Sequence, residues 1–398
     1  MTFRRAAIPA LTGGLVITLL LWWAGASEQA LQLRATTSVF DIKSVVELRR
    51  WLAPWSYDPP TGSLSDGTGA GTAGTAGAGA ALTGSTRYAD LYATAMQIRF
   101  VALFVFFLAG ALLLIHRIPP ARRRAPALLL SLWAWAPVAA KLAVTVSAPW
   151  LIASRGHGSY RILPQLAGVI ASSGPVTVFA GLLTALLTVL VARLTDKGAE
   201  PLPRRTVPSR AARLAASAGT AVVAVSLVVL SHQSVAARIQ TSFGGGGLLS
   251  EPGDLLRQWL LLGAWTGPAA GAFGDWLLYR TVDVLMLAAV WWSLRLLPGL
   301  LTRTTAPAMA VGGVCATVSG LLVSQVLHMA LDDTADVWGP VHRFSELGNG
   351  VPAALTFGVL AGLTALLTLR LSGFNDPDEP SASTSPATAA SPSPTSAE

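Results

Sequence analysis

The side chains best suited to chemistry gather in one short segment near the end of the chain: His328, Asp332, Asp333, His342 and Glu346. If a helix runs through His328, then Asp332 lies four residues further along the same face. An imidazole and a carboxylate so placed could bind one Zn or Mn ion, or act as a general acid and base on a lipid-linked substrate. The spacing fits no known zinc signature, so we favour a solvated acidic loop and keep the metal or acid–base site as the alternative.

Lys141 is a second candidate because it lies within an apolar segment, 127–148. An unpaired charge in a bilayer is costly, so the ammonium group must face other helices, reach water or extend to the interface. We expect a carboxylate partner, and Asp283, Asp90 and Asp275 are the candidates. We favour a structural role for Lys141, either pairing or extension to the interface. A substrate-binding or proton-coupling role is the alternative.

The elements that would position these side chains are membrane-spanning helices. The chain is 52% hydrophobic and only 12% charged, and this is about half the charged fraction usual for a soluble domain. Apolar runs long enough to cross a hydrocarbon core lie at 6–26, 98–117, 127–148, 167–192, 211–232, 281–302, 306–329 and 351–371. The sequence therefore predicts an all-α polytopic integral membrane protein with eight transmembrane helices.

The chain also repeats itself. Ser27, Gln29, Arg34, Thr37 and Ser38 recur 204 residues later as Ser231, Gln233, Arg238, Thr241 and Ser242. Further matches lie 208 and then 180 to 182 residues apart, and a Gly/Ala/Thr-rich run at 61–84, which we interpret as a flexible spacer, accounts for the drop. An internal duplication explains these offsets. Two pairs of arginines then occupy equivalent positions of the two copies on the outer face, Arg34 with Arg238 and Arg161 with Arg343.

Each copy holds four spans, and because four is an even number both copies enter the membrane in the same direction. The sequence thus predicts two parallel four-helix repeats, a 4+4 internal duplication. Repeat A covers 1–192 and repeat B covers 211–372, and a basic, proline-rich cytoplasmic linker at 193–210 joins them. Residues 373–398 are rich in Ser, Thr, Pro and Ala, a composition that predicts a disordered cytoplasmic tail.

Charge in the connections predicts the orientation. Lys and Arg gather on the side of the N-terminus, and the positive-inside rule then places both termini in the cytoplasm and the long connections outside, in the cell membrane of a bacterium. The net charge of +8 follows from this topology and from contact with anionic lipid. The lipid bilayer, and no nucleic acid, is therefore the predicted partner. A cleaved signal peptide over 1–26 is disfavoured because this segment aligns with the mid-chain span 211–232.

Local patterns add detail to this plan. Leu and Trp at helical spacing beside Arg predict interfacial helices at 45–55 and 255–265, in the outer segments. Pro137 and Pro175 predict kinks in the third and fourth spans and, with Gly174, a local open backbone site. We expect Gln325 to form a hydrogen bond between helices. Cys315 is the single cysteine of the chain, so it excludes an intramolecular disulfide and is predicted to pack in the seventh span.

The sequence lacks the phosphate-loop, HExxH and GxSxG motifs of common nucleotide-dependent, zinc-dependent and serine hydrolases. We predict no cofactor. The interpretation we favour is a non-enzymatic transporter, a permease-like unit or a subunit of an envelope complex, with other membrane subunits or a homo-oligomer as possible assemblies. The alternative is a membrane-embedded enzyme or metal-dependent activity at the outer leaflet, using the loop between the seventh and eighth spans.

Overall fold

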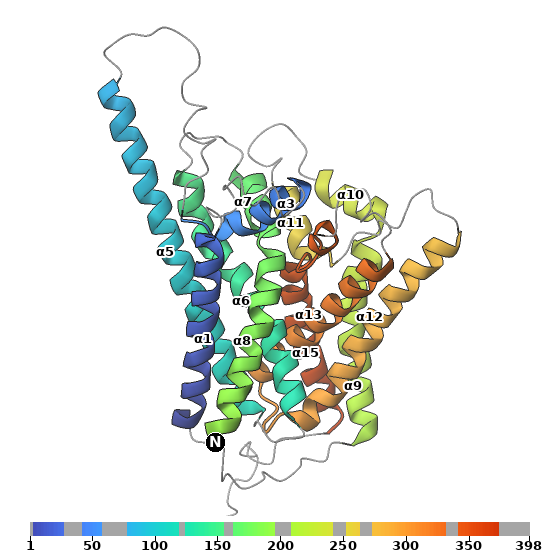
Figure 1. Cartoon of the computed structure of the whole chain (residues 1–398). Helices are drawn as coiled ribbons and strands as arrows, with labels where there is room; N and C mark the ends of the chain where they lie inside the picture. Colours follow the sequence, from blue (N-terminus) through green and yellow to red (C-terminus); the bar gives the residue numbers. More distant parts are fainter. Residues whose placement is uncertain are drawn as a thin grey trace, which may run out of the picture.

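A computed structural model of the chain describes residues 3–27, 42–57, 78–118, 124–154, 162–195, 208–241, 252–262, 273–331 and 341–373. Every regular element within these ranges is helical (Figure 1). Eight helices are long and apolar enough to cross a membrane. This confirms the predicted all-α, multi-pass class, and it follows from a bilayer core that offers no water to unpaired backbone groups.

The eight spans coincide with the segments predicted from hydropathy. The first four are α1 (Phe3–Ala26), α5 (Ala78–Arg117), α6 (Ala125–Ser154) and the pair α7 (Ile162–Ser172) and α8 (Gly174–Thr195). The last four are α9 (Ser209–Ala224) with η3 (Val225–Leu230), α12 (Phe273–Leu300), α13 (Ala306–Leu331) and α15 (Val351–Leu371). One prediction is wrong at its boundary, because α5 begins at Ala78, inside the run at 61–84 interpreted as a flexible spacer.

The spans pack as two groups of four. In the first half, α1 and α6 each pack against both α5 and α8; in the second half, α9 and α13 each pack against both α12 and α15. The halves meet where α6 packs against α13 and α15, and we call this contact the seam. Cys315 is buried in the seam, with its Sγ atom 3.3 Å from the carbonyl oxygen of Ser131 in α6, as expected for a packing residue. In Figure 1, α5 and α12 lean outward at opposite edges of the bundle.

Glycines bring α13 and α15 into close contact. A Cβ atom placed on Gly358 would lie 2.6 Å from the Cα atom of Val314, and one placed on Gly362 would collide with the carbonyl oxygen of Met309. Gly313 faces the same contact from α13. Small residues at such positions let two helix backbones approach directly, which stabilises helix pairs in lipid where the hydrophobic effect cannot.

The shorter helices gather at the end of the bundle away from the N-terminus (Figure 1). These are α3 (Ile42–Leu52), η2 (Ala53–Trp55), α7, α10 (Gln233–Thr241) and α11 (Pro252–Leu260). Helices therefore form within both segments predicted to be interfacial, 45–55 and 255–265. Trp55, however, is fully buried, and Gly25 of α1 packs directly on its carbonyl group. The end of the first segment is thus part of the bundle, and does not lie at the interface.

Candidate functional site

The predicted metal-binding residues are not brought together within the described part of the chain. Asp332 and Asp333 lie outside it, as do Arg34 and Arg161 and the side chain of His342, whose backbone begins η4 (His342–Phe344). Glu346 is exposed, and its Oε2 accepts a hydrogen bond of 2.7 Å from Asn349 Nδ2. The described residues contain no group of three or more His, Cys, Asp or Glu side chains that could hold a metal ion. The metal site therefore stays a prediction.

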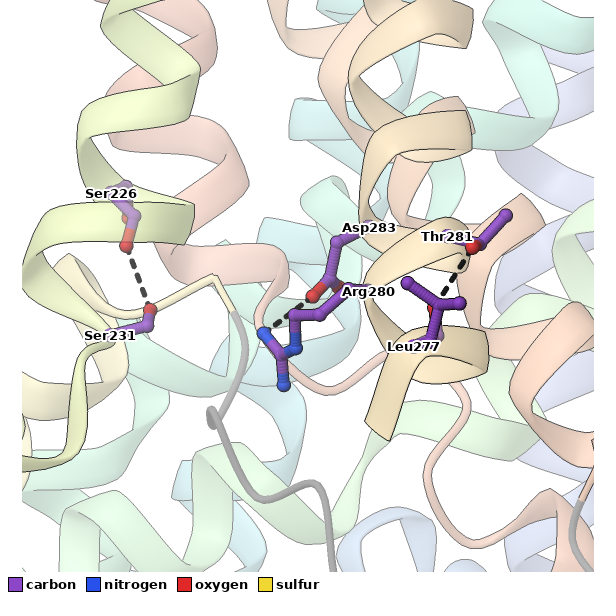
Figure 2. A network of polar contacts seen from close by, with 6 residues as sticks. All are labelled: Ser226, Ser231, Leu277, Arg280, Thr281 and Asp283. Atoms are coloured by element: carbon purple, nitrogen blue, oxygen red, sulfur yellow. Dashed lines mark hydrogen bonds and ion pairs between the residues drawn. The ribbon is translucent and has the colours of Figure 1, made fainter. Parts of the chain in front are cut away.

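His328 lies on α13 and faces α12. Its ring stacks on that of Tyr279, with the centroids 5.2 Å apart and the planes at 22°. Arg280 follows Tyr279 on α12, and its Nη1 donates to Asp283 Oδ2, three residues further along, over 2.7 Å. Figure 2 shows both side chains extending from α12 towards the segment that carries Ser226. Asp283 was a predicted partner of Lys141, and it pairs with Arg280 instead.

A π-helical turn, η3, ends the fifth span beside this cluster. It leaves the carbonyl oxygen of Ser226 to accept from both Ser231 N (3.1 Å) and Ser231 Oγ (2.7 Å), the second of which is drawn in Figure 2. The Ser226 hydroxyl in turn donates to the carbonyl oxygen of Leu260, the last residue of α11. These bonds tie together the end of the second half that lies away from the N-terminus, and they satisfy backbone groups that a regular helix would pair differently.

Lys141 lies where the fourth span is broken. Its side chain is only 3% exposed, and Nζ donates to the carbonyl oxygens of Ile170 and Ala171, the latter over 3.2 Å. Pro175 has no N–H group, so the carbonyl of Ala171 cannot find its usual helical donor. The ammonium group supplies the missing donor at the C-terminal end of α7, where the helix dipole also favours a cation. Among the described residues, backbone carbonyls therefore take the place of the expected carboxylate partner, and the predicted break and open backbone at Pro175 are observed.

We expect Lys141→Met to lower the free energy of unfolding by about 2 kcal/mol, because leaving a buried acceptor unpaired costs about 1–3 kcal/mol. Thermal unfolding of the purified protein in detergent measures the change. Lys43→Met is the matched control, since Lys43 is exposed on α3, and it should have little effect. A Lys141→Met protein as stable as the parent would contradict the structural role and favour the substrate-binding or coupling role.

Gln325 performs a similar task in the second half. Its Nε2 donates to the carbonyl oxygen of Asn349 over 2.8 Å, and its Oε1 accepts from Gly348 N over 3.0 Å. The expected helix–helix bond is therefore replaced by bonds to the turn before α15. Gly348 has φ +80° and packs against Gly174, the first residue of α8, so the break within the fourth span and the turn before the eighth span touch across the seam.

Arg99 is a buried charge that the sequence did not reveal. The residue is 1% exposed on α5; its Nε donates to Ser147 Oγ over 2.9 Å, and its Nη1 donates to the carbonyl oxygen of Pro54. Arg99 escapes prediction because the apolar run at 98–117 places it at a span edge, whereas the spanning helix begins at Ala89. One signal was available: Arg280 follows Arg99 by 181 residues, one of the spacings of the repeat.

The seam also holds an apolar cleft of about 370 Å³. One wall is formed by Val178, Phe179 and Leu182 of α8, and the other by Leu322, Val326 and Met329 of α13. Phe179 is 46% exposed and Val326 is 52% exposed. Exposed apolar side chains on spanning helices face lipid, so the cleft opens sideways into the bilayer. Its size falls within the range of small-molecule sites, which commonly lie between helices of a bundle.

One end of the cleft carries a charge. Arg343, in η4, is the only charged side chain among the described residues that line it, and the neighbouring Phe344 meets Phe179 edge to face at 5.7 Å. The Nε atom of Arg343 is buried and has no hydrogen-bond partner among the described residues. Sequence reasoning identified Arg343 only as the repeat match of Arg161; that it borders a cleft depends on contacts between distant segments.

The fold and the cleft define the class: this is a multi-pass helical membrane protein with a lipid-facing cleft between two groups of four spans. No protein-family model, no curated protein and no solved structure matches the chain. Its function must therefore be inferred from the arrangement itself.

Proposed function

We propose that this chain is a non-enzymatic, permease-like membrane protein that admits a lipid-like amphiphile from the bilayer into the cleft at the seam. The observation that carries the proposal is the cleft itself, which is apolar, opens towards lipid and lies between the two halves. A ligand that enters sideways from the bilayer needs no aqueous path. A site between two halves can also change shape when the halves rock against each other, as in many transporters.

We also propose that the two halves are the products of an internal duplication. The order of packing supports this, because α1, α5, α6 and α8 contact one another in the same pairs as α9, α12, α13 and α15. Arg99 and Arg280 occupy matching places in the second and sixth spans. Lys141 and Gln325, in the third and seventh spans, each bind backbone groups of the following segment: Lys141 at the break within the fourth span, and Gln325 at the turn before the eighth span. The third span, α6, packs against the corresponding seventh span, α13, as expected for parallel repeats related by an axis normal to the membrane.

The proposed orientation follows from the basic connections on the side of the N-terminus, which favour a cytoplasmic location in the cell membrane for both termini. The helices α3, α10 and α11 would then lie outside, with the charged end of the cleft at the outer leaflet. The linker at 193–210 and the tail at 373–398 would be cytoplasmic, and both lie largely outside the described residues.

A larger side chain in the cleft should slow the transfer of lipid from one leaflet to the other. In proteoliposomes that contain fluorescently labelled phosphatidylcholine, we expect Val326→Trp to slow transfer between leaflets by about tenfold, because a rigid indole would narrow the space between α8 and α13. Chemical quenching of the label in the outer leaflet measures this rate. Leu285→Trp is the matched control, since Leu285 is a similarly lipid-facing residue of another cleft, between α12 and α13. A parent protein that moves lipid no faster than protein-free vesicles would overturn the proposal.

The alternative function is a metal-dependent activity that uses the loop between the seventh and eighth spans. His328 does not favour it, because the imidazole is stacked on Tyr279. Metal analysis of the same purified protein separates the two functions. One bound ion per chain, lost in an Asp332→Ala/Asp333→Ala variant, would support the enzyme or metal-handling alternative. A homo-oligomer or a complex with other membrane subunits stays a prediction from the sequence.

A further inference from the structure

We infer that the cleft selects an anionic phospholipid, whose phosphate binds Arg343 while an acyl chain lies between α8 and α13. This inference rests on the proposed function and adds to it the chemical class of the ligand. It joins two observations, an apolar cleft that opens to lipid and a guanidinium group at its end.

The first step concerns the hydrogen bonds of Arg343. A guanidinium group has five N–H donors in a fixed plane, stays charged at any physiological pH and matches the geometry of a phosphate. The Nε donor of Arg343 is buried with no acceptor among the described residues. A buried donor without an acceptor costs free energy, and an anion bound from the membrane would recover that cost.

The second step concerns charge. Among the described residues, no acidic side chain lines the cleft. Glu346, three residues beyond Arg343, is exposed and accepts its hydrogen bond from Asn349. The cleft therefore presents an uncompensated positive charge within its described lining, next to a surface that excludes water. A molecule that is apolar along most of its length and anionic at one end fits both properties, and an anionic phospholipid is the membrane component with this character.

The third step compares the cleft with another of similar size. A second cleft of about 370 Å³ lies between α12 and α13, and the described residues that line it, which include Leu277, Thr281 and Leu285, carry no charged side chain. Apolar grooves alone would accept any acyl chain. The seam cleft differs by Arg343, and so it is the one expected to distinguish headgroups.

The test measures binding of two lipids with identical acyl chains, phosphatidylglycerol and phosphatidylcholine, to the full-length protein in detergent by native mass spectrometry. We expect the parent to prefer the anionic lipid by about tenfold, the contribution of roughly one charge-assisted hydrogen bond. Arg343→Gln should abolish the preference by weakening only phosphatidylglycerol binding. Arg343→Lys should keep part of it, since charge is retained and planar geometry is lost. Arg238→Gln removes the same charge from an exposed position on α10 and should change nothing.

The outcomes separate this inference from the proposed function. If Val326→Trp weakens both lipids but Arg343→Gln leaves the preference intact, the cleft holds lipid and the headgroup inference is overturned. If Val326→Trp changes neither lipid, the cleft is not a lipid site and both proposals fail. A parent without any preference would show that another group neutralises Arg343. Competition by soluble glycerol phosphate at concentrations as low as those of the lipid would assign the site to a free phosphate compound instead.

Discussion

Arg99→Ala should destabilise the protein by about 3–5 kcal/mol, as expected when one member of a buried, hydrogen-bonded polar group is removed. The substitution leaves the Pro54 carbonyl without the guanidinium donor and opens a cavity between α5 and α6. Because Pro54 precedes the buried Trp55, we expect the outer segment to separate from the bundle as well. Thermal unfolding in detergent and protease accessibility of residues 42–57 measure the two effects.

Arg213→Ala is the control for this prediction. Arg213 is exposed on α9, and its Nε donates to the carbonyl oxygen of Ser209 over 3.3 Å, so its loss should change stability by less than about 0.5 kcal/mol. Equal unfolding temperatures for the two variants would show that Arg99 does not hold the outer segment. Arg99→Lys should recover only part of the stability, since an ammonium group cannot reproduce the two directed bonds of the guanidinium.

The second large effect is expected at the glycine contact between α13 and α15. Gly362→Ala adds one methyl group that would collide with the carbonyl oxygen of Met309, and the obstacle is backbone that cannot rotate away. Overpacking of this kind costs about 1–3 kcal/mol, even though alanine favours a helix more than glycine does. We therefore expect a lower unfolding temperature in detergent for this variant.

Gly299→Ala provides the matched control on α12, because a Cβ atom there would meet nothing within 4 Å. The same chemical change should be neutral or stabilising by up to about 1 kcal/mol through helix propensity alone. If Gly362→Ala behaves like Gly299→Ala, then α13 and α15 can separate without cost, and the second half is looser than its packing indicates.

Hydropathy was sufficient to predict the membrane class and the eight spans, because a bilayer demands long apolar helices whatever their partners. It was not sufficient to predict the partner of Lys141. Opposite charge predicts Asp283 as the partner. The break at Pro175, however, leaves backbone carbonyls open as acceptors, and the pattern of side chains in the sequence does not reveal them. For the same reason Gln325 binds a turn, although a bond to a neighbouring helix was expected.

The candidate site was harder to predict than the fold. Its walls come from α8 and α13, whose lining residues Val178 and Val326 are 148 positions apart. The local sequence does not identify those residues as the lining of a cleft, because apolar residues occur equally at positions that face lipid and at positions that line a cleft. Arg343 was noticed only through the repeat, and its place at the end of the cleft emerges once the two halves are packed together.

The broken fourth span has a consequence for how the protein is made. With 11 residues, α7 is about 16 Å long at 1.5 Å per residue, which is roughly half of a hydrocarbon core. A lone α6 would carry Lys141 into the bilayer at a cost of about 2.5–3.5 kcal/mol on insertion scales. The cost falls once α7 is in place, because its open carbonyl groups accept hydrogen bonds from the Lys141 ammonium group. We therefore expect α6 to insert more favourably together with α7 and α8 than alone, so that Lys141 finds its acceptors as the hairpin enters the membrane.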